Sequence, residues 1–355
     1  MDGVDVALID TDGERISRFG PSALHPYRED EIALLRRAVE EARSLTDREA
    51  RPGVLGDAER LVTALHAGAV RVFLDVNGID PASIDVIGFH GQTVLHRPDE
   101  KLTVQIGDGQ LLADEAGIRV VYDLRAADVA AGGQGAPLVP VFHQAMANDL
   151  AREHPIAVLN IGGVANVTFV DGGDPVACDT GPGNAMIDDF MRARTGAPYD
   201  NHGDVAATGT PDQAFIDRVL ADTFFGLRPP KSLDRNAFAF ANIGLPDHSV
   251  ADGAATLSAL TVQAVGRVIA HLPQPPKAWI VAGGGARNAT LVNMLRERLA
   301  PATVETADDV GWSADALEAQ AFAFLAARTL RGLPITFPKT TGAPAPMRGG
   351  IIVRP

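Results

Sequence analysis

An aspartate followed by a glycine-rich turn is the stretch of this sequence with the clearest chemical potential. Asp179 ends an apolar run, and Gly181 and Gly183 enclose a proline before a helical pattern begins at residue 185. A carboxylate at such a corner points towards whatever ligand the turn holds. The glycines would let a ligand approach the backbone closely. The alternative is an aspartate that only bonds the N–H groups of its own turn, which is common before glycine.

Two further glycine-rich corners flank this one. Gly162 and Gly163 lie in the turn of a predicted hairpin, and residues 283–285 are three glycines between a predicted strand and helix. Successive N–H groups in such turns can bind phosphate oxygens, and a helix N-terminus favours the same charge. Each corner alone is weak evidence, but together they predict an enzyme that handles phosphate. A dinucleotide-binding fold is excluded, because its glycine corner follows the first strand, whereas this triple glycine comes late in the chain.

Strand and helix patterns alternate along the chain and would position these corners. Asp12 and Gly13 join two apolar runs and indicate a hairpin. Hairpins are predicted at residues 4–19 and 156–170, a strand at 84–89, strand-helix units at 176–194 and 278–299, and helices at 30–45, 57–77, 254–272 and 314–330. Residues 132–137 are rich in glycine and suggest a crossing between domains. The order predicts a mixed sheet covered by helices, occurring twice.

Composition narrows the class of protein. With 355 residues the chain is expected to form two domains. A net charge of −14 argues against a nucleic-acid or membrane surface, so a phosphate ligand must be held by backbone N–H groups, helix N-termini or a metal ion. Cys178 is the only cysteine, which excludes an internal disulfide and a cysteine metal site. We find no signal peptide and no apolar run long enough to span a bilayer, so we expect a cytoplasmic enzyme.

Three glycine corners on two successive sheet units resemble the sugar-kinase, actin and Hsp70 superfamily, in which two similar domains close over ATP. Several runs make the match narrower, and in chain order they are residues 2–8, 90–93, 105–109, 128–140, 159–167, 179–184, 283–288 and 315–319. By these runs the chain is identified as a member of the anhydro-N-acetylmuramic acid kinase family. The resemblance covers essentially the whole chain.

The resemblance implies an α/β fold of two similar domains, each a mixed β-sheet flanked by helices, with an interdomain cleft, as in actin-like ATPases and ribonuclease H. We expect an N-terminal domain at residues 1–135, completed by residues 340–355, and a nucleotide-binding domain at residues 136–339. The implied activity serves cell-wall recycling: hydrolysis of the 1,6-anhydro bridge of anhydro-N-acetylmuramic acid and phosphorylation of its O6. ATP and Mg²⁺ are the implied cofactors, and a homodimer is implied as well.

Site residues follow from the same resemblance. Asp179 matches the catalytic base, which would activate the water that attacks the anomeric carbon. The residues matched to the sugar side are His90, Gln92, Thr93, Asp108 and Glu318. The residues matched to the nucleotide are Asp2, Gly3, Asp5, Gly162, Gly163, Asn166, Gly181, Gly183, Asn184, Gly283, Gly284, Gly285 and Asn288. No side chain is assigned to the metal.

The sugar-side residues each have a rival interpretation. A single histidine at a strand end, such as His90, is as often structural as functional. Asp108 could belong to a Gly-Asp-Gly turn, and Glu318 could lie on an exposed acidic helix face with Asp315. We favour Glu318 facing the ligand. A proline-rich loop at residues 229–232 also matches the family, and its role is open.

The start of the sequence departs from the family. Members carry a strand ending in Gly-x-Met-Ser-Gly-Thr-Ser before the first Asp-Gly pair, and here Met1 directly precedes Asp2. We therefore expect the first strand and most of one phosphate loop to be missing, with an unpaired edge on the strand at residues 4–10 and a weaker hold on the γ-phosphate. A misplaced start codon is the favoured explanation. The alternatives are a short form that binds sugar or nucleotide without turnover, and a related kinase with another substrate.

Overall fold

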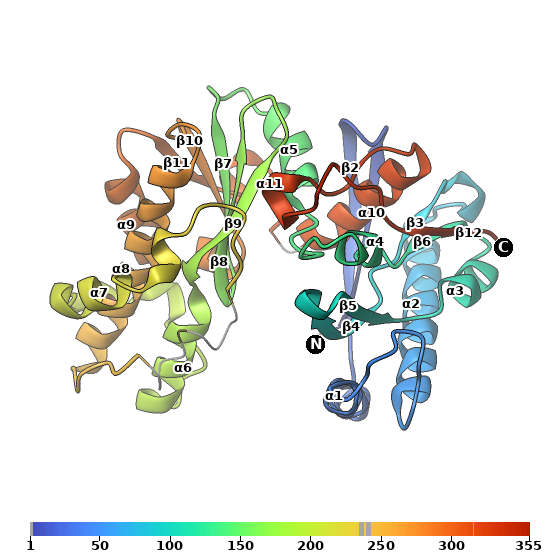
Figure 1. Cartoon of the computed structure of the whole chain (residues 1–355), viewed down its shortest axis with the longest axis horizontal. Coiled ribbons are helices and arrows are strands. Elements are labelled where there is room, and N and C mark those ends of the chain that lie inside the picture. The colour runs from blue at the N-terminus through green and yellow to red at the C-terminus, as the bar shows by residue number, and fades with distance from the viewer. Residues whose placement is uncertain (1–2, 234–237, 239–242, 315) are drawn as a thin grey trace. The chain divides into compact units, whose positions relative to one another are not determined.

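The computed structural model divides the chain into two compact units (Figure 1). It describes residues 3–233, 238, 243–314 and 316–355. Unit 1 comprises Met1–Met146 and Ala316–Pro355, and unit 2 comprises Ala147–Asp315. The expected boundary at residue 135 therefore differs from the observed division by 11 residues, and residues 316–339 belong to unit 1.

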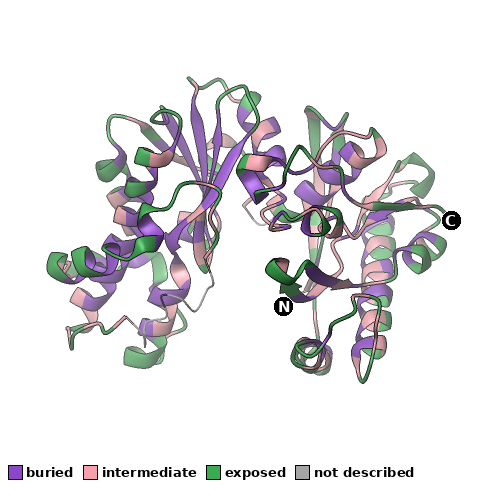
Figure 2. Cartoon of the chain, in the orientation of Figure 1, coloured by how far each residue is buried: buried purple, intermediate pink, exposed green. Residues whose placement is uncertain are grey.

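Unit 2 contains a five-stranded mixed sheet in the order β11-β10-β7-β8-β9. The strands are β7 (Ile156–Ile161), β8 (Val164–Val170), β9 (Val176–Pro182), β10 (Ala278–Ala282) and β11 (Thr303–Thr306). β8 pairs antiparallel with β7 and β9, whereas β10 pairs parallel with β7 and β11. β7, β8, β9 and β10 are almost wholly buried (Figure 2), as expected of near-continuous apolar strands that are covered on both faces, whereas the edge strand β11 is only partly buried. This order is the ribonuclease H-like arrangement, and the expected α/β fold is confirmed.

Helices cover the sheet of unit 2. They are α6 (Asn184–Thr195), α7 (Gln213–Leu220), α8 (Val250–Val268) and α9 (Ala289–Leu299), while α5 (Pro140–Asn148) crosses the boundary between the units. The residues of α8 and the short helix after it, Val250–His271, are long and apolar enough to cross a membrane, with a mean hydropathy of 1.3. The expectation that no apolar run is long enough was therefore wrong. Burial explains the apolar character, because 78% of an 18-residue window in that stretch lies inside the protein.

Unit 1 contains three separate groups of strands. A hairpin is formed by β1 (Gly3–Thr11) and β2 (Ile16–Pro26), a second by β4 (Gln92–Arg97) and β5 (Leu102–Ile106), and a three-stranded sheet by β3 (Ile87–Gly88), β6 (Val120–Tyr122) and β12 (Ile351–Val353). The helices are α1 (Glu29–Ala42), α2 (Leu55–Asn77), α3 (Gly109–Ala116), α4 (Ala126–Ala130), α10 (Leu317–Leu330) and α11 (Pro338–Thr341). The C-terminal strand β12 pairs antiparallel with β6.

Short 3₁₀ helices complete the description of both units. They are η1 (Pro81–Ser83), η2 (Pro98–Glu100), η3 (Asn201–Gly203), η4 (Ala206–Thr208), η5 (Thr223–Gly226), η6 (Ile269–His271), η7 (Gly284–Arg287) and η8 (Asp308–Val310).

Hydrogen bonds tie α10 and the residue after it to the first hairpin, which is why residues 316–339 belong to unit 1. Arg328 Nη1 donates to the carbonyl of Gly13 at 2.7 Å, and Arg331 Nη1 donates to the carbonyl of Asp12 at 2.9 Å. α10 also packs against β1 and β3. Sequence patterns are local, so they could predict this helix but not the hairpin that it contacts.

A buried carboxylate anchors the glycine-rich segment 132–137 inside unit 1. Asp128 is 2% exposed, and its Oδ2 accepts hydrogen bonds from Thr336 Oγ1 at 2.5 Å and from Thr341 Oγ1 at 2.7 Å. Its Oδ1 accepts the N–H of Gly135 at 2.7 Å. The segment that the sequence suggested as a domain crossing is thus fastened to the C-terminal part of its own unit.

We predict that Asp128→Ala lowers the free energy of unfolding by roughly 2–4 kcal/mol, because two buried hydroxyls and one N–H lose their acceptor. Urea unfolding followed by circular dichroism measures this change. Thr336→Ser is the matched control, since it keeps the hydroxyl donor and should cost much less. Equal losses in the two variants would contradict an anchoring role for the carboxylate.

Candidate active site

The three glycine corners meet in unit 2. The N–H of Asn184 donates to the carbonyl of Gly162 at 2.7 Å, and the N–H of Gly183 donates to that of Gly163 at 3.1 Å. Asn184 Nδ2 also donates to the carbonyl of Ile161 at 3.1 Å. The β7–β8 turn and the start of α6 therefore lie against each other and are held together by hydrogen bonds.

Close packing explains why several of these positions are glycine. A Cβ atom on Gly183 would lie 2.4 Å from the carbonyl oxygen of Gly162, and one on Gly283 would lie 2.5 Å from Asn160 Oδ1. Gly283 also has φ of +75°, which side chains disfavour. A Cβ on Gly284 would lie 3.1 Å from Asn184 Nδ2. The triple glycine therefore lies next to the start of α6.

Gly162 and Gly163 differ from these tightly packed glycines. A Cβ on Gly162 would meet neighbouring atoms only at 3.7 Å, which is ordinary contact. Gly162 is half-buried and Gly163 is exposed. Packing alone therefore does not require a glycine at position 162, and the turn has an accessible backbone that a ligand could approach.

Asp179 lies on β9 beside this corner. Its Oδ2 accepts the N–H of Leu233 at 2.6 Å, and its own N–H donates to the carbonyl of Lys231 at 2.9 Å. The β8–β9 register shifts next to it, since Asn166 faces Asp179 but Ala165 faces Gly181. Such a bulge redirects the side chains around it. The carboxylate is thus held in place by two strands and a loop.

Burial raises the pKa of Asp179 to about 6, although the Leu233 N–H and the charge of Lys231 act in the opposite direction. The ammonium of Lys231 donates to the carbonyl of Phe224 at 2.9 Å and lies 4.1 Å from the centre of that ring. A carboxylate with this pKa is ionised at neutral pH yet binds protons more readily than an exposed aspartate. That is the property required of a general base.

Lys231 and Leu233 are contacts that the sequence did not assign. The family-like run at residues 229–232 is the available signal, but the sequence leaves its role open because the Leu-Asp pair that follows it is unusual for that loop. Cys178, next to Asp179, is buried, and burial raises the pKa of its thiol to about 12. It is therefore an unreactive thiol at neutral pH, as the apolar strand suggested.

The other residues matched to the nucleotide have visible structural contacts. Asn288 Oδ1 accepts the N–H of Leu291 at 2.9 Å and so caps α9. Gly181 has φ of +155°, and a Cβ there would lie 3.0 Å from the Cβ of Ala264. In unit 1, a Cβ on Gly3 would lie 2.3 Å from the carbonyl oxygen of His25. Gly285 packs in the same way on Ile161. Asp2 lies outside the described residues.

His90 belongs to a group in unit 1 that includes an arginine missed by the sequence. Arg125 Nη2 lies 3.2 Å from His90 Nε2, and because arginine only donates, that nitrogen accepts. Burial and then the arginine charge lower the pKa of His90 to about 3. The imidazole is therefore neutral at physiological pH. Its ring also packs at a tilt of 57° against Phe322, with 4.6 Å between the ring centres, and the charge of Glu318 acts on Arg125.

The remaining sugar-side residues divide into two groups. His90, Gln92 and Glu318 line one cavity of unit 1, which Gly3 and Asp5 of β1 also line. Thr93 and Asp108 do not line it. Asp108 Oδ1 accepts the N–H of Leu111 at 3.0 Å and caps α3, in agreement with the rival interpretation of a structural turn. Gln92 Nε2 donates to the carbonyl of Thr93 at 3.1 Å.

Comparison with known proteins gives the family. A family model described as anhydro-N-acetylmuramic acid kinase matches residues 1–355. The chain belongs to the anhydro-N-acetylmuramic acid kinase family. The protein of that name from Nitrobacter winogradskyi is 59% identical, and the match covers 100% of this chain and 97% of the relative. A second from Rhodopseudomonas palustris is 60% identical, with 100% and 96% covered.

Solved structures resemble the chain only distantly. Component A of (R)-2-hydroxyglutaryl-CoA dehydratase from Acidaminococcus fermentans has a TM-score of 0.41 at 14% identity, covering 92% of this chain and 99% of that one. The ROK hexokinase from Thermus thermophilus has a TM-score of 0.37 at 13% identity, covering 90% and 98%. These values are too low to support an argument. The fold assignment therefore comes from the strand order in unit 2.

Asp179→Asn should stabilise the protein above pH 6. The folded-state pKa of about 6 exceeds the ordinary value of 3.8, so ionisation costs the folded state free energy. The cost is absent below about pH 4 and complete above pH 6. We expect the variant to gain roughly 1–3 kcal/mol at pH 7 and to match the wild type at pH 4. Denaturant unfolding across this range measures the difference.

Asp174→Asn, at an exposed position, is the control for this experiment and should show no pH-dependent gain. An Asp179→Asn variant that is less stable than the wild type at pH 7 would contradict the burial argument.

Proposed function

We propose that this protein hydrolyses the 1,6-anhydro bridge of anhydro-N-acetylmuramic acid and phosphorylates O6 with ATP, giving N-acetylmuramic acid 6-phosphate and ADP in the cytoplasm. Membership of the family, together with the partly buried carboxylate of Asp179 beside the glycine corners, supports the proposal. The carboxylate is the observation on which the mechanism depends. Opening the anhydro bridge requires a water that has lost its proton, and opening the bridge frees O6 to accept the phosphoryl group.

Asp179 would act as the general base. It removes a proton from water, whose oxygen bonds to the anomeric carbon while the bond from that carbon to O6 breaks. O6 then bonds to the γ-phosphorus, and ADP leaves. With a pKa of about 6, the carboxylate is mostly ionised at pH 7 and can accept this proton. The Leu233 N–H that donates to Oδ2 fixes one oxygen and leaves the other for the water.

The glycine corners would hold the nucleotide. The accessible N–H groups around Gly162 and Gly163 suit phosphate oxygens, and positioning with charge stabilisation is the main requirement of phosphoryl transfer. The triple glycine at residues 283–285 packs against the same turn and would leave room for a flat base. Asn184 joins the two corners through its bond to Ile161.

Mg²⁺ would accompany ATP. Among the described residues, no three His, Cys, Asp or Glu side chains form a group that could hold a metal ion. We therefore assign no side chain to the metal. In kinases Mg²⁺ usually keeps several waters and is bound chiefly through substrate phosphates. The ion would neutralise charge on the phosphates, while the chain's own residues orient them.

His90 and Arg125 would contribute to sugar binding in unit 1. The neutral imidazole and the guanidinium offer hydrogen-bonding groups beside Glu318, which is exposed. Arginine binds carboxylates with two parallel hydrogen bonds, and the lactyl group of the muramic acid carries a carboxylate. Asp108 is not needed for this role, because its side chain caps α3.

The wild-type protein should convert anhydro-N-acetylmuramic acid and Mg-ATP to the 6-phosphate and ADP, detected by mass spectrometry and a coupled ADP assay. We expect Asp179→Asn to lower kcat by about 10²–10⁴ because the base is lost. The wild-type kcat/KM should fall as the pH drops below about 6. Asp174→Asn is the control and should keep normal activity.

Each outcome of this assay decides a separate point. Sugar binding by calorimetry without ADP release would reject the enzyme in favour of a binding protein. Turnover by Asp179→Asn at the wild-type rate would remove its role as base while leaving the kinase assignment intact.

Gly162→Ala should raise the KM for ATP at least several-fold with little loss of stability. A Cβ fits the fold at this position, since its closest contact would be 3.7 Å, but it would obstruct a phosphate lying on the turn. Gly173→Ala is the matched control in the β8–β9 turn, where a Cβ has no neighbour within 4 Å. Steady-state kinetics and thermal unfolding measure both variants. An unchanged KM for ATP would place the phosphates elsewhere.

A further inference from the structure

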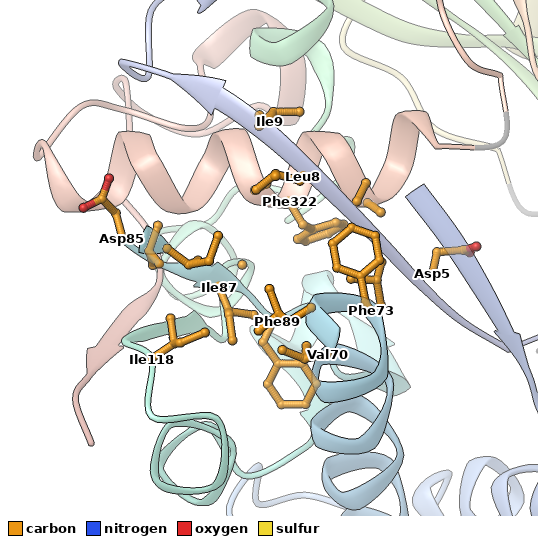
Figure 3. A pocket seen from close by; sticks show the side chains of 18 of the residues that line it. Asp5, Leu8, Ile9, Val70, Phe73, Asp85, Ile87, Phe89, Ile118 and Phe322 are labelled. Atoms are coloured by element: carbon orange, nitrogen blue, oxygen red, sulfur yellow. The ribbon is translucent and has the colours of Figure 1, made fainter. Parts of the chain in front are cut away.

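Two parallel strands of unit 1 end at the same edge, beside the candidate sugar residues. β3 leads through Phe89, which lies close to Ile87 in Figure 3, into His90. β6 pairs with β3 in parallel, and the N–H of Phe89 donates to the carbonyl of Val121 at 2.8 Å. Ligands of open α/β sheets bind outside the carboxyl ends of such strands. The residues that follow β6 therefore lie where a sugar bound at His90 would meet them.

Asp123, the first residue after β6, has an unusual backbone conformation. Its φ is +55°, in the left-handed region that residues other than glycine seldom adopt. Aspartate tolerates this region better than most residues, but the conformation still costs free energy and persists only where the surroundings fix it. The chain leaves the direction of the strand here, shortly before Arg125.

An ion pair fixes Asp123. Arg48, from the loop between α1 and α2, donates from Nη2 to Asp123 Oδ2 at 2.5 Å. The side chain of Asp123 is only 9% exposed, and neither its Oδ1 nor Arg48 Nε, both buried, has a hydrogen-bond partner among the described residues. Such a carboxylate depends on its cation, because removing the cation leaves an uncompensated buried charge. Burial raises the pKa of Asp123, and the bond from Arg48 acts in the opposite direction.

Arg48 is in turn held against α2. Arg51 Nη1 donates to the carbonyl of Arg48 at 2.7 Å, and Arg51 Nε donates to Glu59 Oε1 on α2 at 2.9 Å. The same carboxylate oxygen accepts the N–H of Gly107 at 3.2 Å. The loop that carries Arg48 is therefore fastened to a helix, and its ion pair gives the end of β6 a fixed position.

Arg125 is the side chain that this arrangement places. In the described part of the chain its guanidinium hydrogen-bonds only to neutral groups, the carbonyl of Gly135 at 2.9 Å and His90 Nε2 at 3.2 Å. The charge of Glu318 also acts on it, while burial lowers the pKa of Arg125. A half-buried guanidinium with neutral partners keeps donors for an anion, and its planar form suits a carboxylate.

We propose that Arg48 and Asp123 are positioning residues that make the sugar site selective for a carboxylate. Their ion pair holds the chain after β6 in its left-handed turn and so keeps the guanidinium of Arg125 beside His90, where its remaining donors can bind the carboxylate. The proposal rests on the proposed function, in which the lactyl carboxylate of anhydro-N-acetylmuramic acid binds at this place. It adds the residues on which the selectivity depends.

Two sugars separate selectivity from general damage. The probes are anhydro-N-acetylmuramic acid and 1,6-anhydro-N-acetylglucosamine, which lacks the lactyl carboxylate, each with Mg-ATP. For the wild-type protein, kcat/KM should be at least tenfold higher with the first sugar, because hydrogen bonds to a charged group are gained only there. Arg48→Met should lower kcat/KM for the first sugar about tenfold, chiefly by raising KM, and leave the second nearly unchanged.

Further variants test the ion pair itself. Asp123→Ala should act like Arg48→Met. Asp123→Asn keeps a hydrogen-bond acceptor and tolerates the left-handed region, so it should retain most of the preference. Arg60→Met is the matched control, because Arg60 also pairs with an aspartate, Asp57, but at an exposed position on α2. It should leave the ratio between the two sugars unchanged.

Nitrogen NMR of the histidine side chains gives a readout that needs no turnover. Because Arg125 only donates, His90 Nε2 accepts and the ring proton lies on Nδ1. The wild-type spectrum at neutral pH should show this tautomer, and Arg48→Met should show a mixture of both tautomers. His90→Gln assigns the signals. Should Arg48→Met fail to fold, Arg48→Lys keeps a cation and should show a smaller change of the same kind.

Two results would overturn the proposal. One is an equal loss of kcat/KM with both sugars in Arg48→Met, which would mean general damage. The other is an unchanged tautomer of His90 in folded Arg48→Met and Asp123→Ala variants. If the wild type turned over neither sugar, the proposed function would fail on its own. The ratio of the two sugar dissociation constants, measured by calorimetry, would then decide the selectivity.

Discussion

The contact between Asp179, in the middle of β9, and the loop at residues 231–233 constrains the candidate site in unit 2. One backbone bond and one side-chain bond hold Asp179 against this loop, while β8 holds the other edge of the same strand. The glycine corners can be close to the carboxylate only because β9 ends here and α6 begins immediately afterwards. The burial that raises the pKa of Asp179 is a result of the same arrangement.

The sequence predicted those parts of the site that depend on neighbouring residues. Asp179 and the glycine corners were recognisable because each corner is a short run with its own turn chemistry. Lys231, Leu233 and Arg125 were not, because each acts on a residue at least 35 positions away. Asp108 is the opposite case: its run resembles the family's, and in the structure its carboxylate also has a local partner in α3.

Fold prediction had the same limit. Hairpins, helices and the mixed sheets followed from apolar spacing and turn residues. The allocation of α10 to unit 1 did not, because it depends on Arg328 and Arg331 contacting the first hairpin. Glycines at residues 132–135 suggested a crossing between domains, yet Asp128 fastens that segment inside its own unit. The apolar sequence of α8 has its cause in burial, because most of the helix lies inside unit 2. Composition alone does not reveal that burial.

The two units differ in how the chain builds them. Unit 2 is one continuous segment, whereas unit 1 combines the first 146 residues with the last 40. Domains generally form as units while the chain is synthesised from its N-terminus. The continuous unit can therefore fold as soon as it leaves the ribosome, but the first hairpin must wait for α10, and β6 must wait for β12. Contacts between the two ends of the chain carry a large loop-closure cost and slow folding. Unit 1 is accordingly the last part of the protein to fold, and until then its strand edges need protection from aggregation.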